Sequence, residues 1–220
     1  MQRLQGKSGG MGVTATMAMA CALIWIAMPV PAEDKVVVIP MMEAPTAAPV
    51  PKTGQTQSYA TGDDGYLEKG VAGPTPRFTD NGNGTVTDRL TDLVWLKNGS
   101  CVKFFVLDAK AENPRTWSEA VDSANRLANG YCGLTDNSKA GDWRLPNRKE
   151  LDSLIDLGQY EPALPPDCPL RASTVAKYHW SATSYALVPG DAWCVSFEYG
   201  YDDRCGKSIP LYVRAVRSLH

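Results

Sequence analysis

The clearest helical pattern in the sequence lies between Thr116 and Asn129. Thr116 is followed three residues later by Glu119, which is the spacing of a capping box. Gly130 then supplies a residue that commonly ends helices. The sequence therefore predicts a helix over Thr116–Asn129. Its apolar residues fall on one face of a helical wheel, and they are Trp117, Ala120, Val121, Ala124, Leu127 and Ala128.

A second, shorter helix is predicted from Asn147 to Leu157. Asn147 is a good N-cap, and Glu150 again stands three residues after it. Gly158 follows the last apolar position. The inward-facing residues of this helix are Leu151, Leu154 and Ile155.

Short segments rich in β-branched and aromatic residues flank the two helices and predict strands. They cover residues 77–80, 85–88, 93–96, 178–183, 192–198 and 212–217. Two Asn-Gly pairs in the segment 81–84 predict a tight turn between the first two strands. Because strands come first, helices in the middle and strands again at the end, the pattern predicts an α+β domain.

The N-terminal region has a different pattern. Arg3 and Lys7 precede an uncharged, apolar stretch over 11–30, and Val30-Pro31-Ala32 offers small residues for cleavage. We therefore expect residues 1–32 to be a signal peptide, although an uncleaved stretch of this length could anchor the chain in a membrane. Residues 33–51 contain repeated prolines and predict an extended tether. The folded domain is expected over 52–220.

The net charge of the chain and its expected export restrict the functions that it can have. Residues 1–32 contain two basic and no acidic residues, so that 20 basic and 24 acidic residues remain in the expected mature chain. This acidic balance argues against a nucleic-acid partner, which requires a basic surface. Export would place the domain outside the cytoplasm, in the periplasm, on the cell surface or secreted, where disulfides are stable.

Five cysteines lie beyond the signal region, and none forms a Cys-x-x-Cys motif, so no zinc ribbon or thioredoxin site is indicated. If a two-residue turn at Tyr199-Gly200 closes the last hairpin, Cys194 and Cys205 are directly opposite and close enough for a disulfide. Cys101 and Cys132 bracket the first helix, and a bridge between them would tie both of its ends. Cys168 is left over, either free or paired with another chain.

The chain contains a series of distinctive motifs, which lie at residues 53–56, 62–65, 76–88, 93–95, 141–151 and 212–217. Together they resemble the Lcl C-terminal domain family, named for the C-terminal domain of the Legionella collagen-like adhesin. The resemblance covers residues 52–220 and implies a C-type-lectin-like α+β fold in an exported protein that binds glycans or other surface ligands. The chain departs from the family where Gly73 replaces a frequent Trp, where Asp92 replaces a usual Gly, and in the extra cysteine Cys168.

Candidate chemistry points to binding rather than turnover. The sequence has only two histidines, no Gly-x-Ser-x-Gly elbow and no phosphate-binding loop, so we expect no catalytic residue, no metal and no cofactor. Aromatic rings stack on the apolar faces of sugars, while carboxylates and guanidinium groups bond to hydroxyls. The candidate ligand-binding residues on the terminal hairpin are Tyr199, Tyr201, Asp202, Asp203 and Arg204.

The sequence therefore favours a non-enzymatic exported module that binds a glycan or a surface protein. A structural component of the cell envelope, without a small ligand, is the alternative. A third hypothesis, an oxidase relative suggested by Arg144-Leu145-Pro146, would need free thiols at Cys194 and Cys205. Arg144 itself is predicted to be a buried hydrogen-bonding hub before the second helix.

Overall fold

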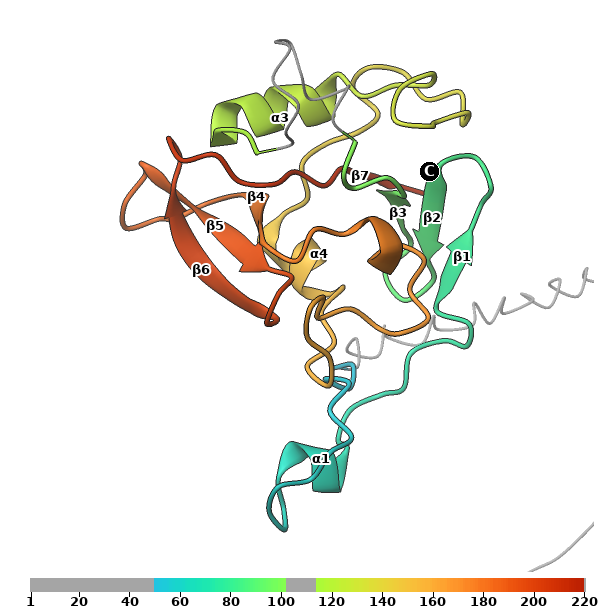
Figure 1. Ribbon diagram of the computed structural model, residues 1–220, viewed down its shortest axis with the longest axis vertical. Helices are drawn as coiled ribbons and strands as arrows, with labels where there is room; N and C mark the ends of the chain where they lie inside the picture. The colour runs from blue at the N-terminus through green and yellow to red at the C-terminus, as the bar shows by residue number, and fades with distance from the viewer. Residues whose placement is uncertain (1–49, 102–113, 220) are drawn as a thin grey trace, which may run out of the picture. The chain divides into compact units, whose positions relative to one another are not determined.

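The structure is a computed structural model and describes residues 50–101 and 114–219 (Figure 1). The expected signal peptide and residues 33–49 of the expected tether lie outside these ranges. Within the described ranges, none of the helices has the length and apolar character needed to cross a bilayer.

Four strands form the first sheet, in the order β1-β2-β3-β7. They are β1 (Phe78–Asp80), β2 (Thr85–Asp88), β3 (Leu93–Leu96) and β7 (Val216–Ser218). All neighbours are antiparallel, and β7 pairs with β3, so that the last strand of the chain closes against the first ones. The last strand was predicted over residues 212–217. Only Val216 and Arg217 of this range belong to β7, because Tyr212 instead forms an isolated bridge with His179.

The second sheet consists of β4 (Tyr178–Ser184), β5 (Asp191–Ser196) and β6 (Tyr201–Gly206), in that order and antiparallel throughout. Strand β6 lies at an edge of this sheet. Together with the helices, the two antiparallel sheets give the α+β class that the sequence predicted.

Both predicted helices are present but shorter than expected. Helix α3 is Trp117–Asn125, and the Glu119 carboxylate accepts hydrogen bonds from the backbone N–H and the hydroxyl of Thr116, at 2.9 and 2.7 Å. It ends early because the N–H groups of residues 129 and 130 donate to the loop that follows the helix. Helix α4 is Arg148–Asp152, and Asn147 with Glu150 completes a reciprocal capping box. Two short elements complete the set, α1 (Asp64–Leu67) and the 3-10 turn η1 (Arg171–Ser173).

Two apolar clusters form the core and meet at the first sheet. Val94 and Leu96 face α3 and the second sheet, whereas Trp95 faces α4. Strand β3 is therefore buried on both sides, which explains its uninterrupted apolar sequence. Helix α4 lies between the two sheets (Figure 1), and its Leu151 is fully buried there.

Disulfides connect Cys101 with Cys132 and Cys194 with Cys205. The first one ties the region before α3 to the region after it. By chain entropy, closing a loop with a sequence separation of 31 residues contributes about 3–4 kcal/mol to stability. Cys168 has no disulfide partner and is buried.

Residues 50–73, which we call the N-terminal strap, form a loop whose ends meet. Pro51 bridges Val71, and the N–H of Leu157 donates to Thr53 O at 2.9 Å, which ties the strap to the domain. The chain passes closely over itself inside the strap, where a side chain at Gly65 would clash with the backbone of residue 57. The end of the expected tether is thus part of the folded unit.

Candidate functional site

The hairpin of β5 and β6 carries the candidate residues, and its register differs from the expected one. Cys194 pairs with Asp203, and Cys205 pairs with Ala192, so that the disulfide joins diagonal neighbours with Cα atoms 6.1 Å apart. The predicted two-residue turn was wrong, because the loop runs from Phe197 to Gly200.

Packing against the rest of the domain accounts for this wider loop. Gly200 donates its N–H to Ser196 O at 2.9 Å and has a φ of 77°. A Cβ atom at Gly200 would press against Ile155, Leu157 and Ala163. The loop therefore rests on residues far away in the sequence, which local turn preferences do not include.

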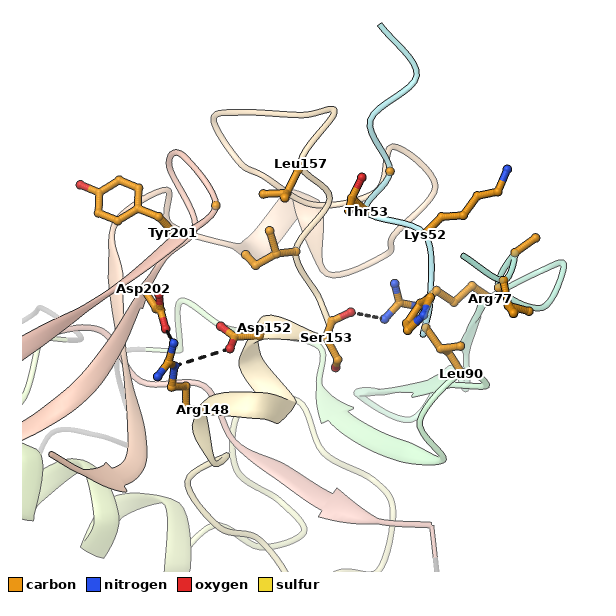
Figure 2. A pocket seen from close by; sticks show the side chains of 17 residues that line it. Lys52, Thr53, Arg77, Leu90, Arg148, Asp152, Ser153, Leu157, Tyr201 and Asp202 are labelled. Carbon is orange, nitrogen blue, oxygen red and sulfur yellow. Dashed lines mark hydrogen bonds and ion pairs between the residues drawn. The ribbon is translucent and has the colours of Figure 1, made fainter. Parts of the chain in front are cut away.

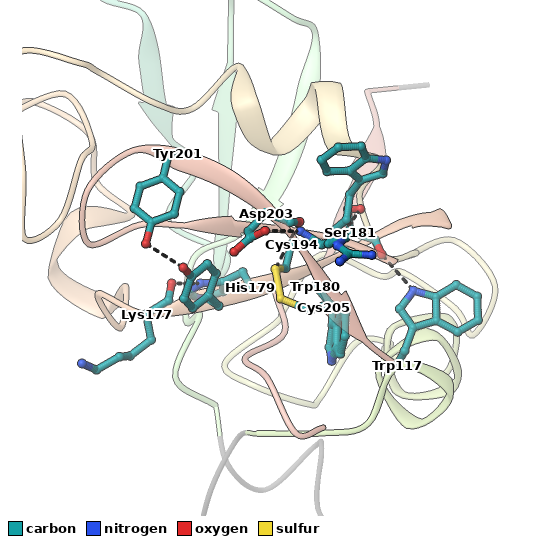
Figure 3. Close-up of a disulfide and its surroundings, with 12 residues drawn as sticks. Trp117, Lys177, His179, Trp180, Ser181, Cys194, Tyr201, Asp203 and Cys205 are labelled. Carbon is teal, nitrogen blue, oxygen red and sulfur yellow. Dashed lines mark hydrogen bonds between the residues drawn. A yellow bond between two sulfur atoms is a disulfide. The ribbon is translucent and has the colours of Figure 1, made fainter. Parts of the chain in front are cut away.

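The pleat of β6 divides the predicted ligand-binding residues between two faces. Tyr201 and Asp203 lie on the face that also carries Cys205, and Figure 3 shows Asp203 near the disulfide. Asp202 and Arg204 lie on the opposite face. The cluster expected from sequence proximity is therefore two separate surfaces.

Three tyrosines, which we call the tyrosine shelf, occupy the first of these surfaces: Tyr178, Tyr199 and Tyr201. The rings of Tyr199 and Tyr201 are stacked, 6.4 Å apart and nearly parallel, and both are about half exposed. Tyr178 meets Tyr201 edge-on, and their hydroxyl oxygens are 2.7 Å apart. The sequence analysis missed Tyr178, because only the pairing of β4 with β5 brings it beside Tyr201.

Hydrogen bonds and charges determine the protonation of the groups in and around the tyrosine shelf. The bond to Tyr201 raises the pKa of Tyr178 to about 12, so that the Tyr178 hydroxyl stays protonated near neutral pH. The Tyr199 hydroxyl lowers the pKa of Glu198, which also forms an ion pair with Lys177 at 3.3 Å. The shelf is thus aromatic, rich in hydroxyls and flanked by carboxylates.

Arg204 belongs to a different neighbourhood. Its guanidinium group is 3.7 Å from Asp191 and 5.8 Å from the ring centroid of Tyr185. Its backbone N–H donates to Asp203 Oδ1 at 2.7 Å. Charged side chains on an edge strand also discourage unwanted strand pairing, so Arg204 has a structural role as well.

A cleft of about 650 Å³ lies beside the same hairpin (Figure 2). The strap forms one wall, α4 and the turn after it form another, and residues 200–202 form the third. Its volume falls in the range of small-molecule sites. Of the predicted residues, Tyr201 and Asp202 line it.

Arg148 is the central charge of the cleft. Its guanidinium contacts Asp202, lies 3.7 Å from Asp152 and sits 3.8 Å above the ring of Trp193. Burial raises the pKa of Asp152. At the other end, Arg77 is fully engaged, since it binds Asp88 through two hydrogen bonds and donates a third to the carbonyl of residue 153.

Within the described ranges, the histidine (His179) and the free cysteine (Cys168) are both buried inside the domain. Burial lowers the pKa of His179 to about 3, and its Nδ1 is 3.1 Å from Lys177 O. Burial raises the pKa of the Cys168 thiol to about 11. Among the residues that the structure describes, no group of three His, Cys, Asp or Glu side chains could hold a metal ion.

The prediction that Arg144 is a buried hub was wrong. Its side chain is 41% exposed and forms two hydrogen bonds to Glu150, at 2.7 and 2.6 Å. The fully buried arginine is Arg214. Asp92, noted above as a departure from the family, has a φ of 55°, which is the left-handed region that glycine adopts most easily.

Fold and site define a small α+β domain with two disulfides, an aromatic surface and an adjoining cleft. The chain belongs to the Lcl C-terminal domain family, whose model matches residues 84–217. This family is associated with adhesins and is not a known enzyme family. A search of curated proteins found no match to the chain. The strap precedes the matched region, so one wall of the cleft lies outside it.

Proposed function

We propose that the protein is an exported, non-enzymatic binding module that presents its terminal hairpin to a glycan or a surface protein. The observation that carries this proposal is the tyrosine shelf. Flat aromatic rings at a protein surface offer an apolar face to a sugar ring or an apolar side chain, and neighbouring hydroxyls and carboxylates fix its orientation.

The shelf is also rigid before any ligand arrives. The Cys194–Cys205 disulfide links the two strands of the hairpin, and the hydroxyl contact ties Tyr201 to Tyr178 on β4. Preorganisation of this kind reduces the entropy lost on binding. We assign the ligand contacts to the three shelf tyrosines together with Asp203.

The remaining parts of the proposal concern the fold class, the order of segments along the chain and the location of the protein. We propose a C-type-lectin-like fold, which is supported by two helices, two antiparallel sheets and the pairing of β7 with β3. We also propose a signal peptide at 1–32 and a tether at 33–51 ahead of the domain. The two disulfides suit an extracytoplasmic location.

The competing hypotheses have less support. An envelope component linked to a partner through Cys168 would need an accessible thiol, but this side chain is buried. An oxidase relative would need free thiols at Cys194 and Cys205, and these two residues form a disulfide.

A glycan array and a cell-surface binding assay with the secreted protein test the proposal. We expect saturable binding that the double substitution Tyr201→Ala with Asp203→Ala reduces at least tenfold, while circular dichroism and the melting temperature stay close to those of the parent. Tyr59→Ala is the matched control, because Tyr59 is 80% exposed and lies in the strap. Binding that survives the double substitution would overturn the assignment to the shelf.

A further inference from the structure

Three carboxylates lie beside the tyrosine shelf, and we call them the acidic rim: Glu161, Glu198 and Asp203. Asp203 is on the same face of β6 as Tyr201, two residues further along the strand. The Glu198 carboxylate interacts with the hydroxyl of Tyr199. The N–H of Glu161 donates to the carbonyl oxygen of Glu198 at 2.8 Å, which brings a second loop to the shelf.

The acidic rim is only partly neutralised by ion pairs. Lys177 pairs with Glu198 at 3.3 Å. Within the described residues, neither Glu161 nor Asp203 forms an ion pair, and both of these side chains are exposed. Two carboxylates of the rim therefore face the solvent beside the shelf without a cation of their own.

The other cations near the rim are directed elsewhere. The guanidinium group of Arg171 donates to two carbonyl groups of the loop that follows Glu161. Arg204 is next to Asp203 in the sequence, but it lies on the opposite face of β6 and pairs with Asp191. Even when Arg171 and Lys177 are both counted against the three carboxylates, the surroundings of the shelf stay negative.

The negative charge acts on the shelf itself. The hydrogen bond to Glu198 and the charge of that carboxylate raise the pKa of Tyr199, and the charge of Glu161 adds to the rise. The Tyr199 hydroxyl is therefore in reach of two carboxylates. A charged group of a ligand that stacks on this ring is exposed to the same field.

A neutral sugar ring suits such a surface. Its C–H groups stack on aromatic rings, and its hydroxyl groups donate hydrogen bonds that are strong because the carboxylate acceptors are charged. A sulfate group or the carboxylate of a uronic acid has no proton to donate near neutral pH and places a like charge beside the rim. Like charges brought together in this way lower the affinity.

We propose that the tyrosine shelf selects uncharged sugar rings and rejects anionic glycans, with the acidic rim as the determinant of this specificity. The inference rests on the proposed function and takes the glycan alternative of that proposal. The tyrosines provide the stacking surface and the rim provides the selectivity, so that substitutions can change the two separately.

The test measures binding of the secreted protein to immobilised lactose, N-acetyllactosamine and cellobiose, each beside its 6′-O-sulfated form. We expect at least one neutral disaccharide to bind about ten times more tightly than its sulfated form. This ratio should fall as the salt concentration increases from about 0.05 to about 0.5 M, because salt screens the repulsion. A sulfated form that binds as tightly as its neutral partner would overturn the inference, and so would a ratio that does not depend on salt.

Substitutions assign the selectivity to the acidic rim. Glu161→Gln combined with Glu198→Gln keeps the side-chain shapes and removes two charges, so it should reduce the ratio of neutral to sulfated affinity at least fivefold. The matched control is Glu68→Gln combined with Asp122→Asn, which removes two exposed carboxylates in the strap and in α3 and should leave the ratio unchanged. An unchanged ratio in the rim variant, at a melting temperature close to that of the parent, would refute the assignment.

A shelf variant separates this inference from the proposed function. If Tyr199→Ala weakens the neutral and the sulfated form equally from equal starting affinities, the shelf binds glycans and only the selectivity is wrong. If no disaccharide binds, but Tyr199→Ala abolishes binding to cells, the ligand is a protein, which overturns the inference and leaves the proposed function intact. Glycan binding that Tyr199→Ala does not weaken would overturn both.

Discussion

Arg148 in the cleft and Arg214 in the core show two opposite ways of holding a guanidinium group. Arg148 is partly exposed, stacks on Trp193 and is paired with two carboxylates. Arg214 has no exposed surface, and no carboxylate in the described residues forms an ion pair with it. Its Nη2 donates to Thr174 Oγ1 at 2.6 Å.

The remaining contacts of Arg214 are weaker. Its Nη1 is 3.4 Å from Leu96 O, its Nε has no hydrogen-bond partner among the described residues, and the ring centroid of Phe197 is 5.9 Å from the guanidinium. Burial lowers the pKa of Arg214 to about 10. The core thus holds a charge with neutral dipoles, whereas the cleft balances its guanidinium group with carboxylates. The charge of the cleft is open to solvent, and the charge of Arg214 is not.

The largest expected effect on stability comes from removing the buried charge of Arg214. Arg214→Ala should lower the free energy of unfolding by about 3 kcal/mol or more, because it leaves a cavity and unpaired oxygens at Leu96 and Thr174. Arg214→Met should destabilise much less, since it fills most of the space and removes the desolvation penalty of the charge. Urea unfolding with the disulfides intact measures both values.

Arg89→Ala is the control for this series, because Arg89 is exposed and its side chain donates to the carbonyl of Pro76 at the surface. Its effect should stay within about 0.5 kcal/mol. If Arg214→Ala were as mild as this control, Arg214 would be open to water and the contrast with Arg148 would fail.

The pH dependence of stability tests the contrast between the buried core and the open cleft, because His179 is buried in the same region as Arg214. The folded-state pKa of His179 is about 3, far below the ordinary value of 6.5. Between these values only the unfolded chain takes up a proton, so the free energy of unfolding should fall as the pH decreases from about 6.5. One such group changes stability by up to about 1.4 kcal/mol per pH unit.

Urea unfolding between pH 6.5 and 5 measures this slope above the range in which most carboxylates titrate. His179→Phe removes the titrating group and keeps a ring against Phe197 and Tyr212, so its slope should be flatter than that of the parent. Parallel slopes in the two proteins would show that His179 is hydrated and able to take up a proton in the folded state.

The two regions also differ in how far the sequence could predict them. Both helix N-termini were predicted, because Thr116 with Glu119 and Asn147 with Glu150 satisfy local backbone groups. Such caps depend on neighbours in the sequence. The helix C-termini were not predicted, since the N–H groups that follow them bond to the next loops and, at Leu157, to the strap.

Non-local packing likewise explains what was missed at the site. Residues 213–217 alternate imperfectly between apolar and charged positions, so no burial was predicted for Arg214, whereas residues 213–216 are all buried. Tyr178 joined the shelf only through strand pairing, and the motifs at residues 53–56 and 62–65 did not indicate that the strap forms a wall of the cleft. The sequence allowed the helix caps and the types of the site residues to be predicted. It did not predict which residues lie side by side, because this depends on contacts between segments far apart in the chain.

The smallest stability effect is expected at Arg148. Arg148→Met should lower the free energy of unfolding by about 1 kcal/mol or less, because the side chains of Arg148, Asp152 and Asp202 are 31%, 37% and 26% exposed and water screens their interaction. Because burial raises the pKa of Asp152, the loss should shrink as the pH decreases and protonation of Asp152 relieves its repulsion with Asp202. Urea unfolding of Arg148→Met, Asp152→Asn and the double variant gives the coupling energy between the two residues. A loss as large as that of Arg214→Ala would mean that the cleft is part of the core and that its charges hold the fold together.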